Sequence, residues 1–303
     1  MKVDIDQEFF SSVLKHYFYF MEFSVSSSLS YNVLSTTTFF FNIMALKSTT
    51  QLILEESLVV TPAIAFEEFS IDSSNARFIK MEVEKGKSFT ITYKAKVDVM
   101  FTQIKEEDLL ASISFMEMDH DVLPFIAPSR HCESDKLMEF AINKFGTLPN
   151  AYAKVLAIED WIFNNVKYTT GSTNSSASAT DTIMRGVGVC KDVAHLGIAL
   201  CRALDIPARY FTSYACNLTP PDFHACFEAY INGHWIVFDP TKLAPLNGLV
   251  KISNGKDASE VAVASYFGEI YCTNMDVQCH PLSDEFVPFN WENRRGEAIS
   301  YLF

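Results

Sequence analysis

The sequence has no apolar run long enough to cross a bilayer and no internal repeat. Its most apolar stretch, TTTFFFNIMAL at residues 36–46, is far shorter than the roughly 20 residues that a membrane-spanning helix needs. The N-terminus carries Lys2 followed by acidic residues, without the basic, apolar and small-residue regions of a signal peptide. We therefore expect a protein without a membrane anchor, located in the cytoplasm.

Positive charge is also scarce. The chain has 24 Lys and Arg against 37 Asp and Glu, which gives a formal net charge of −13. Nucleic acids and anionic lipids are bound by clustered Lys and Arg, so we expect neither as a partner. The 303 residues, 49% of them hydrophobic, leave room for two domains with sizeable cores.

The common metal-binding spacings are missing. There is no CxxC pair and no acidic cluster with the spacing of a calcium site. Three pairs of soft ligands do occur: His131 with Cys132, His224 with Cys226, and Cys279 with His280. Neighbouring Cys and His seldom bind one zinc ion together, so a zinc site is the weaker alternative and we expect no metal or other cofactor.

The seven cysteines lack the density of a disulfide-stapled scaffold. This favours reduced thiols, most of them buried. It leaves room for one reactive cysteine.

The first part of the chain is typical of β structure. β-Branched and aromatic residues gather in four stretches separated by turn residues: 36–46, 51–60, 76–86 and 87–101. The turn from Lys85 to Lys87 predicts a hairpin between the last two. Such evenly spaced strands predict an antiparallel, β-sandwich-like domain over residues 1–125.

The pattern changes after DVLPFIAPSRHCES, residues 121–134, which contains two prolines. A second domain is therefore predicted over residues 126–303. Its predicted helices are 134–146, 148–168 and 190–207, and its predicted strands are 208–216, 223–231 and 234–241. Asn232-Gly233 between the last two strands is a strong hairpin signal.

Cys190 lies in RGVGVCKD, behind Gly186 and Gly188 and at the start of a predicted helix. The positive end of the helix dipole favours the thiolate. The glycines would let a substrate carbonyl approach, and free backbone N–H groups there could bind an oxyanion. The small polar residues 169–182 just ahead are interpreted as a solvated linker or, alternatively, as an active-site flap.

His224 and Asp239 are expected at one end of the predicted hairpin. With a two-residue turn, Ile231 pairs with His234 and His224 faces Thr241, which makes Asp239 a near neighbour of His224. A carboxylate bonded to an imidazole fixes its tautomer and supports its protonated form. Each residue alone favours a structural role. Together with Cys190 they suggest a nucleophile, a base and an orienting acid.

Three separated motifs resemble the transglutaminase-like superfamily of cysteine enzymes. They are Gly188-Val189-Cys190 with Asp192, Arg202-Ala203-Leu204 running into Ile206-Pro207-Ala208-Arg209, and His224-Ala225 followed by Trp235 through Asp239-Pro240-Thr241. The resemblance covers about residues 150–245. The upstream β-rich stretches are similar, more loosely, to the N-terminal domain of bacterial members.

The resemblance implies an α+β protein in which a papain-like core follows the N-terminal β domain. It also implies Cys190, His224 and Asp239 as a catalytic triad. The Cys190 amide is expected as one oxyanion donor and a side chain from residues 168–176, with Tyr168 preferred, as the other. Such enzymes attack an amide carbonyl of a protein or peptide and form a thioester, which passes to water or to an amine. The expected activity is that of a cysteine protease or a transglutaminase-like acyltransferase.

The chain departs from the family pattern at two positions. Cys226 stands where the family commonly has Trp after His-Ala, and Asp205 stands where it usually has Gly. No calcium dependence is expected. The alternative function is a non-catalytic binding or scaffold protein with the same fold.

Other polar residues in these motifs are interpreted as structural. Asp192 is expected to stabilise the helix start, and Arg202 and Arg209 are expected to form ion pairs. His195 is expected on a different side of the helix from Cys190 and is not expected to be the base.

Overall fold

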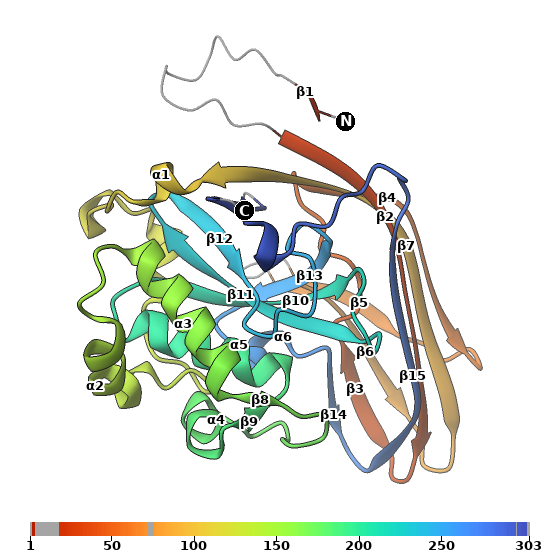
Figure 1. The fold of residues 1–303 in the computed structure, drawn as a ribbon. Helices are drawn as coiled ribbons and strands as arrows, with labels where there is room; N and C mark the ends of the chain where they lie inside the picture. Colours follow the sequence, from red (N-terminus) through yellow and green to blue (C-terminus); the bar gives the residue numbers. More distant parts are fainter. Residues whose placement is uncertain (1, 4–17, 72–75, 295, 302–303) are drawn as a thin grey trace.

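The computed structural model describes residues 2–3, 18–71, 76–294 and 296–301. Long curved strands form one end of the molecule and a group of helices covers strands at the other (Figure 1). No helix in these ranges combines the length and apolar composition needed to cross a membrane. Most of the N-terminal stretch in which no signal peptide is expected lies outside the described residues.

A ten-stranded antiparallel sheet runs through the whole molecule. Its path is β1-β2-β7-β16-β12-β11-β10-β13, with β15 on β2 and β4 on β7. The bounds are β1 Lys2–Val3, β2 Phe18–Val33, β4 Gln51–Thr61, β7 Ser88–Lys105, β10 Ala208–Ala215, β11 Phe223–Ile231, β12 His234–Phe238, β13 Leu249–Gly255, β15 Ile270–Pro281 and β16 Glu297–Ser300. Burial alternates along most of β2, as expected for a strand with one face on a core.

A second sheet, in the order β14-β3-β6-β5, packs against the first. Its strands are β3 Thr37–Phe41, β5 Glu67–Ile71, β6 Ala76–Val83 and β14 Ala264–Phe267. Phe39 of β3 is fully buried, with its ring centroid 5.5 Å from Tyr31 of β2 and 5.1 Å from Phe89 of β7. Aromatic packing between the two sheets therefore forms the core of the N-terminal β domain.

The predicted hairpin at Lys85 to Lys87 is wrong in its pairing. The turn forms, with Gly86 at φ 82°, but β6 pairs with β3 and β5 whereas β7 pairs with β2, β4 and β16. Met81 and Phe89, on either side of the turn, are buried in the same core. The chain crosses here from one layer to the other, so the two strands face each other through side chains and not through hydrogen bonds.

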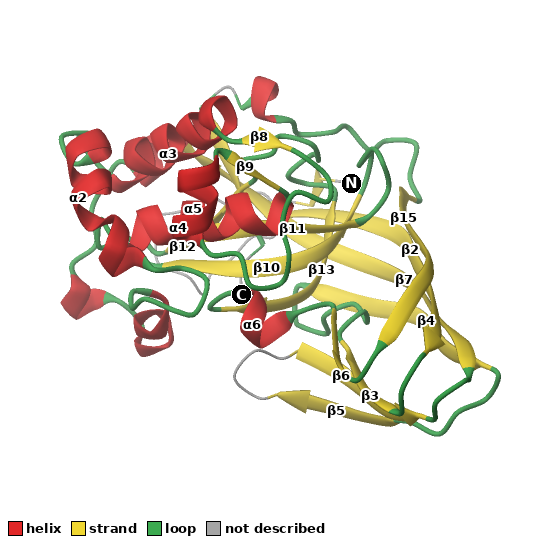
Figure 2. Cartoon of the chain, turned by 90° about the horizontal axis from the view of Figure 1, so that it is seen from below, coloured by secondary structure: helices red, strands yellow, loops and turns green. Residues whose placement is uncertain are grey.

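Helices cover one face of β10, β11 and β12 (Figure 2). The helices on this side are α2 Ser134–Phe145, α3 Ala151–Asn165, α4 Ala179–Arg185 and α5 Cys190–Arg202. There are also short helices α1 Glu106–Leu109 and α6 Ala258–Val261 and 3-10 helices at Phe115–Glu117, His120–Phe125 and Trp291–Asn293. The 3-10 helix His120–Phe125 packs on the other face, where the Phe125 ring contacts Trp235. A two-stranded parallel pair joins β8 Lys167–Tyr168 to β9 Val187–Gly188. In α5 every residue from Asp192 to Arg202 is buried. A Cβ at Gly197 would lie 2.6 Å from the Phe227 ring, so this glycine lets α5 sit directly on β11.

The division at residues 125 and 126 stays a prediction. Strands from beyond that point return to the first part of the chain: β14 pairs with β3, β15 with β2, and β16 with β7. Three strand pairs thus join residues on the two sides of the predicted boundary by backbone hydrogen bonds.

A buried charge cluster ties three central strands together. Glu228 of β11 accepts bonds from Arg209 Nε of β10 at 2.7 Å and from Lys251 Nζ of β13 at 2.6 Å. Burial alone would raise the pKa of Glu228, but the two cations bring it below its usual value. The expected ion-pair role of Arg209 is confirmed. Arg202 instead donates to backbone carbonyls, including Ala208 O at 3.0 Å.

Glu228→Gln should lower the free energy of unfolding by about 3–5 kcal/mol, because it leaves two cations buried without their carboxylate. Denaturant unfolding monitored by circular dichroism measures this change. Glu22→Gln is the matched control, since Glu22 pairs with Lys96 at the surface. Glu22→Gln should lower the free energy of unfolding by less than about 1 kcal/mol. Equal costs for the two variants would show that the buried cluster is not a major stabilising element.

Candidate active site

Cys190 is the first residue of α5 and is half-buried. Asp192 caps the helix start, because its Oδ2 accepts a 2.9 Å bond from Val189 N. The expected structural role of Asp192 is therefore confirmed. Cys190 thus lies in the first turn of a helix of 13 residues, where the helix dipole favours negative charge.

The two glycines ahead of Cys190 have local structural roles. Gly186 ends α4 in the left-handed conformation, with φ 64°. A Cβ at Gly188 would lie 3.0 Å from the Asp192 side chain and 3.4 Å from Thr182. The glycines were predicted to leave open space for a substrate carbonyl. In the structure Gly186 forms a turn and Gly188 allows a close packing contact.

The polar segment ahead of Cys190 is bonded to the start of α5. Thr173 Oγ1 donates to Asp192 Oδ2 at 2.5 Å, and Lys191 Nζ donates to Asn174 O at 2.9 Å. The loop is also shorter than predicted, because Ser178 and Asp181 form a capping box that starts α4. These contacts hold the segment beside Cys190.

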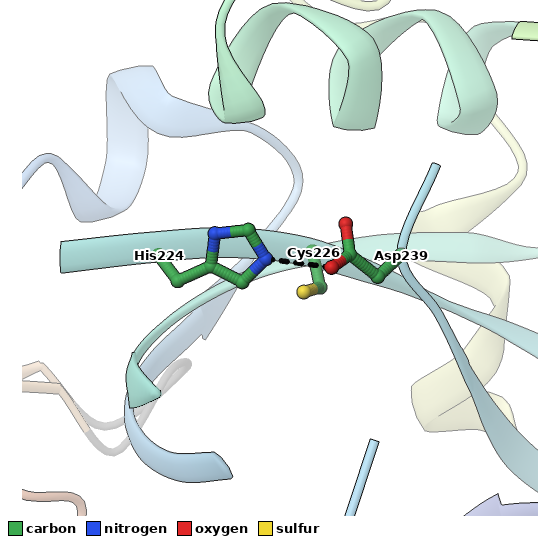
Figure 3. Close-up of side chains that lie close together, drawn as sticks. All are labelled: His224, Cys226 and Asp239. Atoms are coloured by element: carbon green, nitrogen blue, oxygen red, sulfur yellow. Dashed lines mark hydrogen bonds and ion pairs between the residues drawn. The ribbon is translucent and has the colours of Figure 1, made fainter. Parts of the chain in front are cut away.

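His224 and Asp239 form a buried pair. Their Nε2 and Oδ2 atoms are 2.8 Å apart (Figure 3), and both side chains are 1% exposed. Asp239 Oδ1 accepts bonds from Thr241 N at 3.0 Å and Thr241 Oγ1 at 2.7 Å. With all of these bonds made, the carboxylate is fixed in orientation and directs the imidazole.

The hairpin register behind this pair agrees with the prediction. Ile231 pairs with His234, and the ladder continues to Phe227 with Phe238. Asn232 and Gly233 both have positive φ, 45° and 84°, as a two-residue hairpin turn requires. His224 itself pairs on its other side with Ser213 of β10.

The electrostatics of the pair favour a charged imidazole. Burial opposes protonation, yet interactions with Cys226 and Asp239 and a hydrogen bond with Cys190 raise the pKa of His224 well above its usual value. Burial raises the pKa of Cys226 to about 12, so this thiol is neutral near pH 7 and Asp239 is the anion that stabilises His224. Conversely, His224 and Thr241 outweigh burial and lower the pKa of Asp239.

Cys190 and His224 border one cavity of about 600 Å³. Because the Nε2 atom of His224 is engaged with Asp239, its Nδ1 atom is the nitrogen left for Cys190. Tyr168 pairs with Gly188 across β8 and β9 and is 41% exposed. Burial and the Cys190 thiol raise the pKa of Tyr168, but Tyr168 is not among the residues that line the cavity. Its role as an oxyanion donor stays a prediction.

Two family models match the chain. Residues 21–121 match the bacterial transglutaminase N-terminal domain and residues 139–240 match the transglutaminase-like superfamily. A solved structure of a proposed cysteine protease from Cytophaga hutchinsonii is 51% identical, with a TM-score of 0.91 over 94% of this chain and 100% of that chain. This protein belongs to the transglutaminase-like superfamily. The α+β architecture, with a papain-like core after an N-terminal β domain, is confirmed.

Curated relatives are more distant. An uncharacterized protein of Mycobacterium leprae is 28% identical over 117 residues, which cover 36% of this chain and 42% of that protein. An uncharacterized protein of Mycobacterium tuberculosis is 28% identical over 154 residues, 46% of each chain. The matched region thus spans less than half the length of these relatives.

One cluster in this transglutaminase-like core could supply the ligands of the alternative metal site. His224, Cys226 and Asp239 are described residues whose ligand atoms lie within 4.8 Å of one another (Figure 3). However, His224 Nε2 and Asp239 Oδ2 already share a hydrogen bond, and Asp239 Oδ1 accepts two bonds from Thr241. These donors fit a hydrogen-bonded pair beside a neutral thiol better than a metal centre.

A stacked histidine pair was missed from the sequence. The rings of His131 and His195 stack with centroids 5.0 Å apart, and both residues line the cavity. His195 Nε2 accepts a 3.1 Å bond from Ala258 N. Burial, with the nearby His131, lowers the pKa of His195 to about 3. It is therefore a neutral, structural residue. Because the stack joins residues 64 positions apart, no local pattern reveals it.

His195→Phe should make stability less sensitive to acid. A histidine with a folded pKa of about 3 and an unfolded pKa near 6.5 stabilises the fold above pH 6.5, and this contribution is lost as the pH falls toward 3, at up to about 1.4 kcal/mol per pH unit. Urea unfolding at pH 7 and pH 5 measures the loss. The wild type should lose more than the variant, while exposed His120→Phe should match the wild type. Equal losses in all three proteins would contradict a buried neutral His195.

Proposed function

We propose that this protein is a cysteine-dependent hydrolase or acyltransferase acting on amide bonds of proteins or peptides. In this proposal Cys190 is the nucleophile, His224 the general base and Asp239 the residue that orients the base. The observation that carries the proposal is the buried 2.8 Å bond between His224 and Asp239, beside the cavity that Cys190 and His224 both border.

Because the imidazole is charged in the resting site, the chemistry begins from a pair in which His224 Nδ1 holds the proton and Cys190 is the thiolate. The thiolate attacks the amide carbonyl, and the oxyanion is bound by the Cys190 amide at the start of α5, with Tyr168 as the second donor. His224 then donates its proton to the departing amine, which leaves a thioester on Cys190. Asp239 stays ionised and stabilises the imidazolium throughout.

The thioester passes either to water or to a second amine. We favour water as the acceptor, because none of the described residues that line the cavity closes it to solvent. The Cytophaga hutchinsonii relative also carries the name of a proposed cysteine protease. We also propose the cytoplasm as the site of action. Incubation with a casein-like acceptor and a fluorescent amine, with assays for ammonia and new N-termini, separates amidase, crosslinking and protease activity. No product in any of the three assays would favour the scaffold alternative.

Cys190→Ala should abolish turnover and change the melting temperature little, because Cys190 is half-buried at the rim of the cavity. Differential scanning fluorimetry and the product assays measure both effects. Cys201→Ala is the matched control: Cys201 is fully buried in the same helix, so this variant should lose stability and keep its activity when folded. A large loss of melting temperature in Cys190→Ala would assign Cys190 to the core instead.

Asp239→Asn should lower kcat by at least about 100-fold, with a smaller change in KM, because the uncharged amide neither fixes the tautomer nor stabilises the imidazolium. The alkaline limb of the kcat profile should also move to lower pH, since the imidazolium protonates the departing amine and loss of the carboxylate lowers the pKa of His224. Asp160→Asn is the control, because Asp160 pairs with Lys242 and is 63% exposed. An unchanged kcat in Asp239→Asn would remove Asp239 from the mechanism.

A further inference from the structure

The wall of the cavity beside Cys190 differs in charge from the protein as a whole. The chain carries a formal net charge of −13, yet no Asp or Glu is among the described residues that line this cavity. The lining residues with a permanent charge are both basic, Arg130 and Lys191. The permanently charged side chains of the cavity wall are thus opposite in sign to the net charge of the chain.

Of these two basic residues, Arg130 is the one whose side chain is available to pair with an anion. The Lys191 ammonium is bound to Asp192 and to the Asn174 carbonyl. Arg130 is exposed, and within the described part of the chain it forms no ion pair with a carboxylate. Its backbone is nevertheless held, because Ser129 and Cys132 exchange backbone bonds at 3.0 and 3.2 Å and His131 N donates to Asp257 Oδ2 at 2.8 Å.

Carboxylates bonded to cavity residues or next to them in the chain are already bound by other groups, as Asp239 is by His224. Asp257 accepts from His131 N and from Ser259 N and Oγ, and Asp192 accepts from Val189 N and Thr173 Oγ1. Asp222 accepts from Phe223 N, and burial raises its pKa. These bonds reduce the competition that such groups offer to an incoming anion.

We propose that the cavity selects acyl donors with a carboxylate close to the reacting amide, and that Arg130 is the specificity-determining residue. The planar guanidinium binds a carboxylate through two parallel N–H bonds, and the amino end of α5 adds positive potential next to Cys190. The carboxylate belongs to a Glu or Asp side chain of the substrate or to its C-terminus. The inference rests on the proposed function, because it assigns a substrate class to that site.

The first test compares two alkylating reagents of similar size, anionic iodoacetate and neutral iodoacetamide. Mass spectrometry gives the rate at the Cys190 peptide and at the exposed Cys272, which serves as an internal reference. The ratio of the iodoacetate rate to the iodoacetamide rate should be larger at Cys190 than at Cys272, by about threefold or more for a partly solvated charge. Added salt should reduce the difference.

Variants assign the effect to Arg130. Arg130→Gln should lower the ratio at Cys190 toward that at Cys272, with a smaller change in the iodoacetamide rate, while the amino end of α5 still contributes part of the preference. Arg185→Gln is the matched control, because Arg185 is also exposed but pairs with Asp181 on α4 and is not among the cavity residues. Equal ratios at Cys190 and Cys272, or a ratio unaffected by Arg130→Gln, would overturn the inference.

The outcome is separable from failure of the proposed function. If Cys190 reacted with iodoacetamide no faster than Cys272, the nucleophile itself would be wrong. If Cys190 reacted faster than Cys272 with iodoacetamide but showed no preference for iodoacetate, only the proposed substrate class would be refuted. Peptide pairs then identify the source of the carboxylate: Glu against Gln beside the reacting amide, and a free against an amidated C-terminus. In one of these pairs the peptide with the carboxylate should have the lower KM in the wild type, and Arg130→Gln should remove that difference. Equal KM values within both pairs in the wild type would contradict the inference.

Discussion

The site depends on the buried hydrogen bond between His224 and Asp239. The bond requires two strands to present these residues at the same end of a hairpin, and the two-residue turn at Asn232 and Gly233 sets that register. A slip by one residue would turn one of the side chains to the opposite face of the sheet. The positive φ values of the turn are thus linked directly to the position of the imidazole.

The second constraint positions Cys190 at the cavity that His224 also borders. Helix α5 is buried from Asp192 to Arg202 and rests on β11 where Gly197 meets the Phe227 ring. Its first turn is held by Asp192, which also binds the preceding loop through Thr173. Cys190 is therefore positioned by packing along the whole helix and by polar contacts at its start.

The sequence predicted what depends on local signals. The helix beginning at Cys190, the strand pair around Asn232-Gly233 and the nearness of His224 to Asp239 all follow from short patterns. The turn at Lys85 to Lys87 was also recognised, but its strands join different sheets, because pairing depends on partners such as β2 and β3 that are distant in the chain. The charge cluster of Glu228 and the stacked ring of His195 involve long-range contacts, which no local pattern encodes.

The return of the final strands to the first sheet makes the two family regions depend on one another for folding. Strand β15 covers β2 from Phe23 to Val33, so a fragment cut after the N-terminal region would leave that row of amides and carbonyls unpaired. Open edges of this kind promote self-association. Excision or swapping of either region should therefore respect the strand pairing and not the order of the chain, with residues 264–281 kept alongside the N-terminal part.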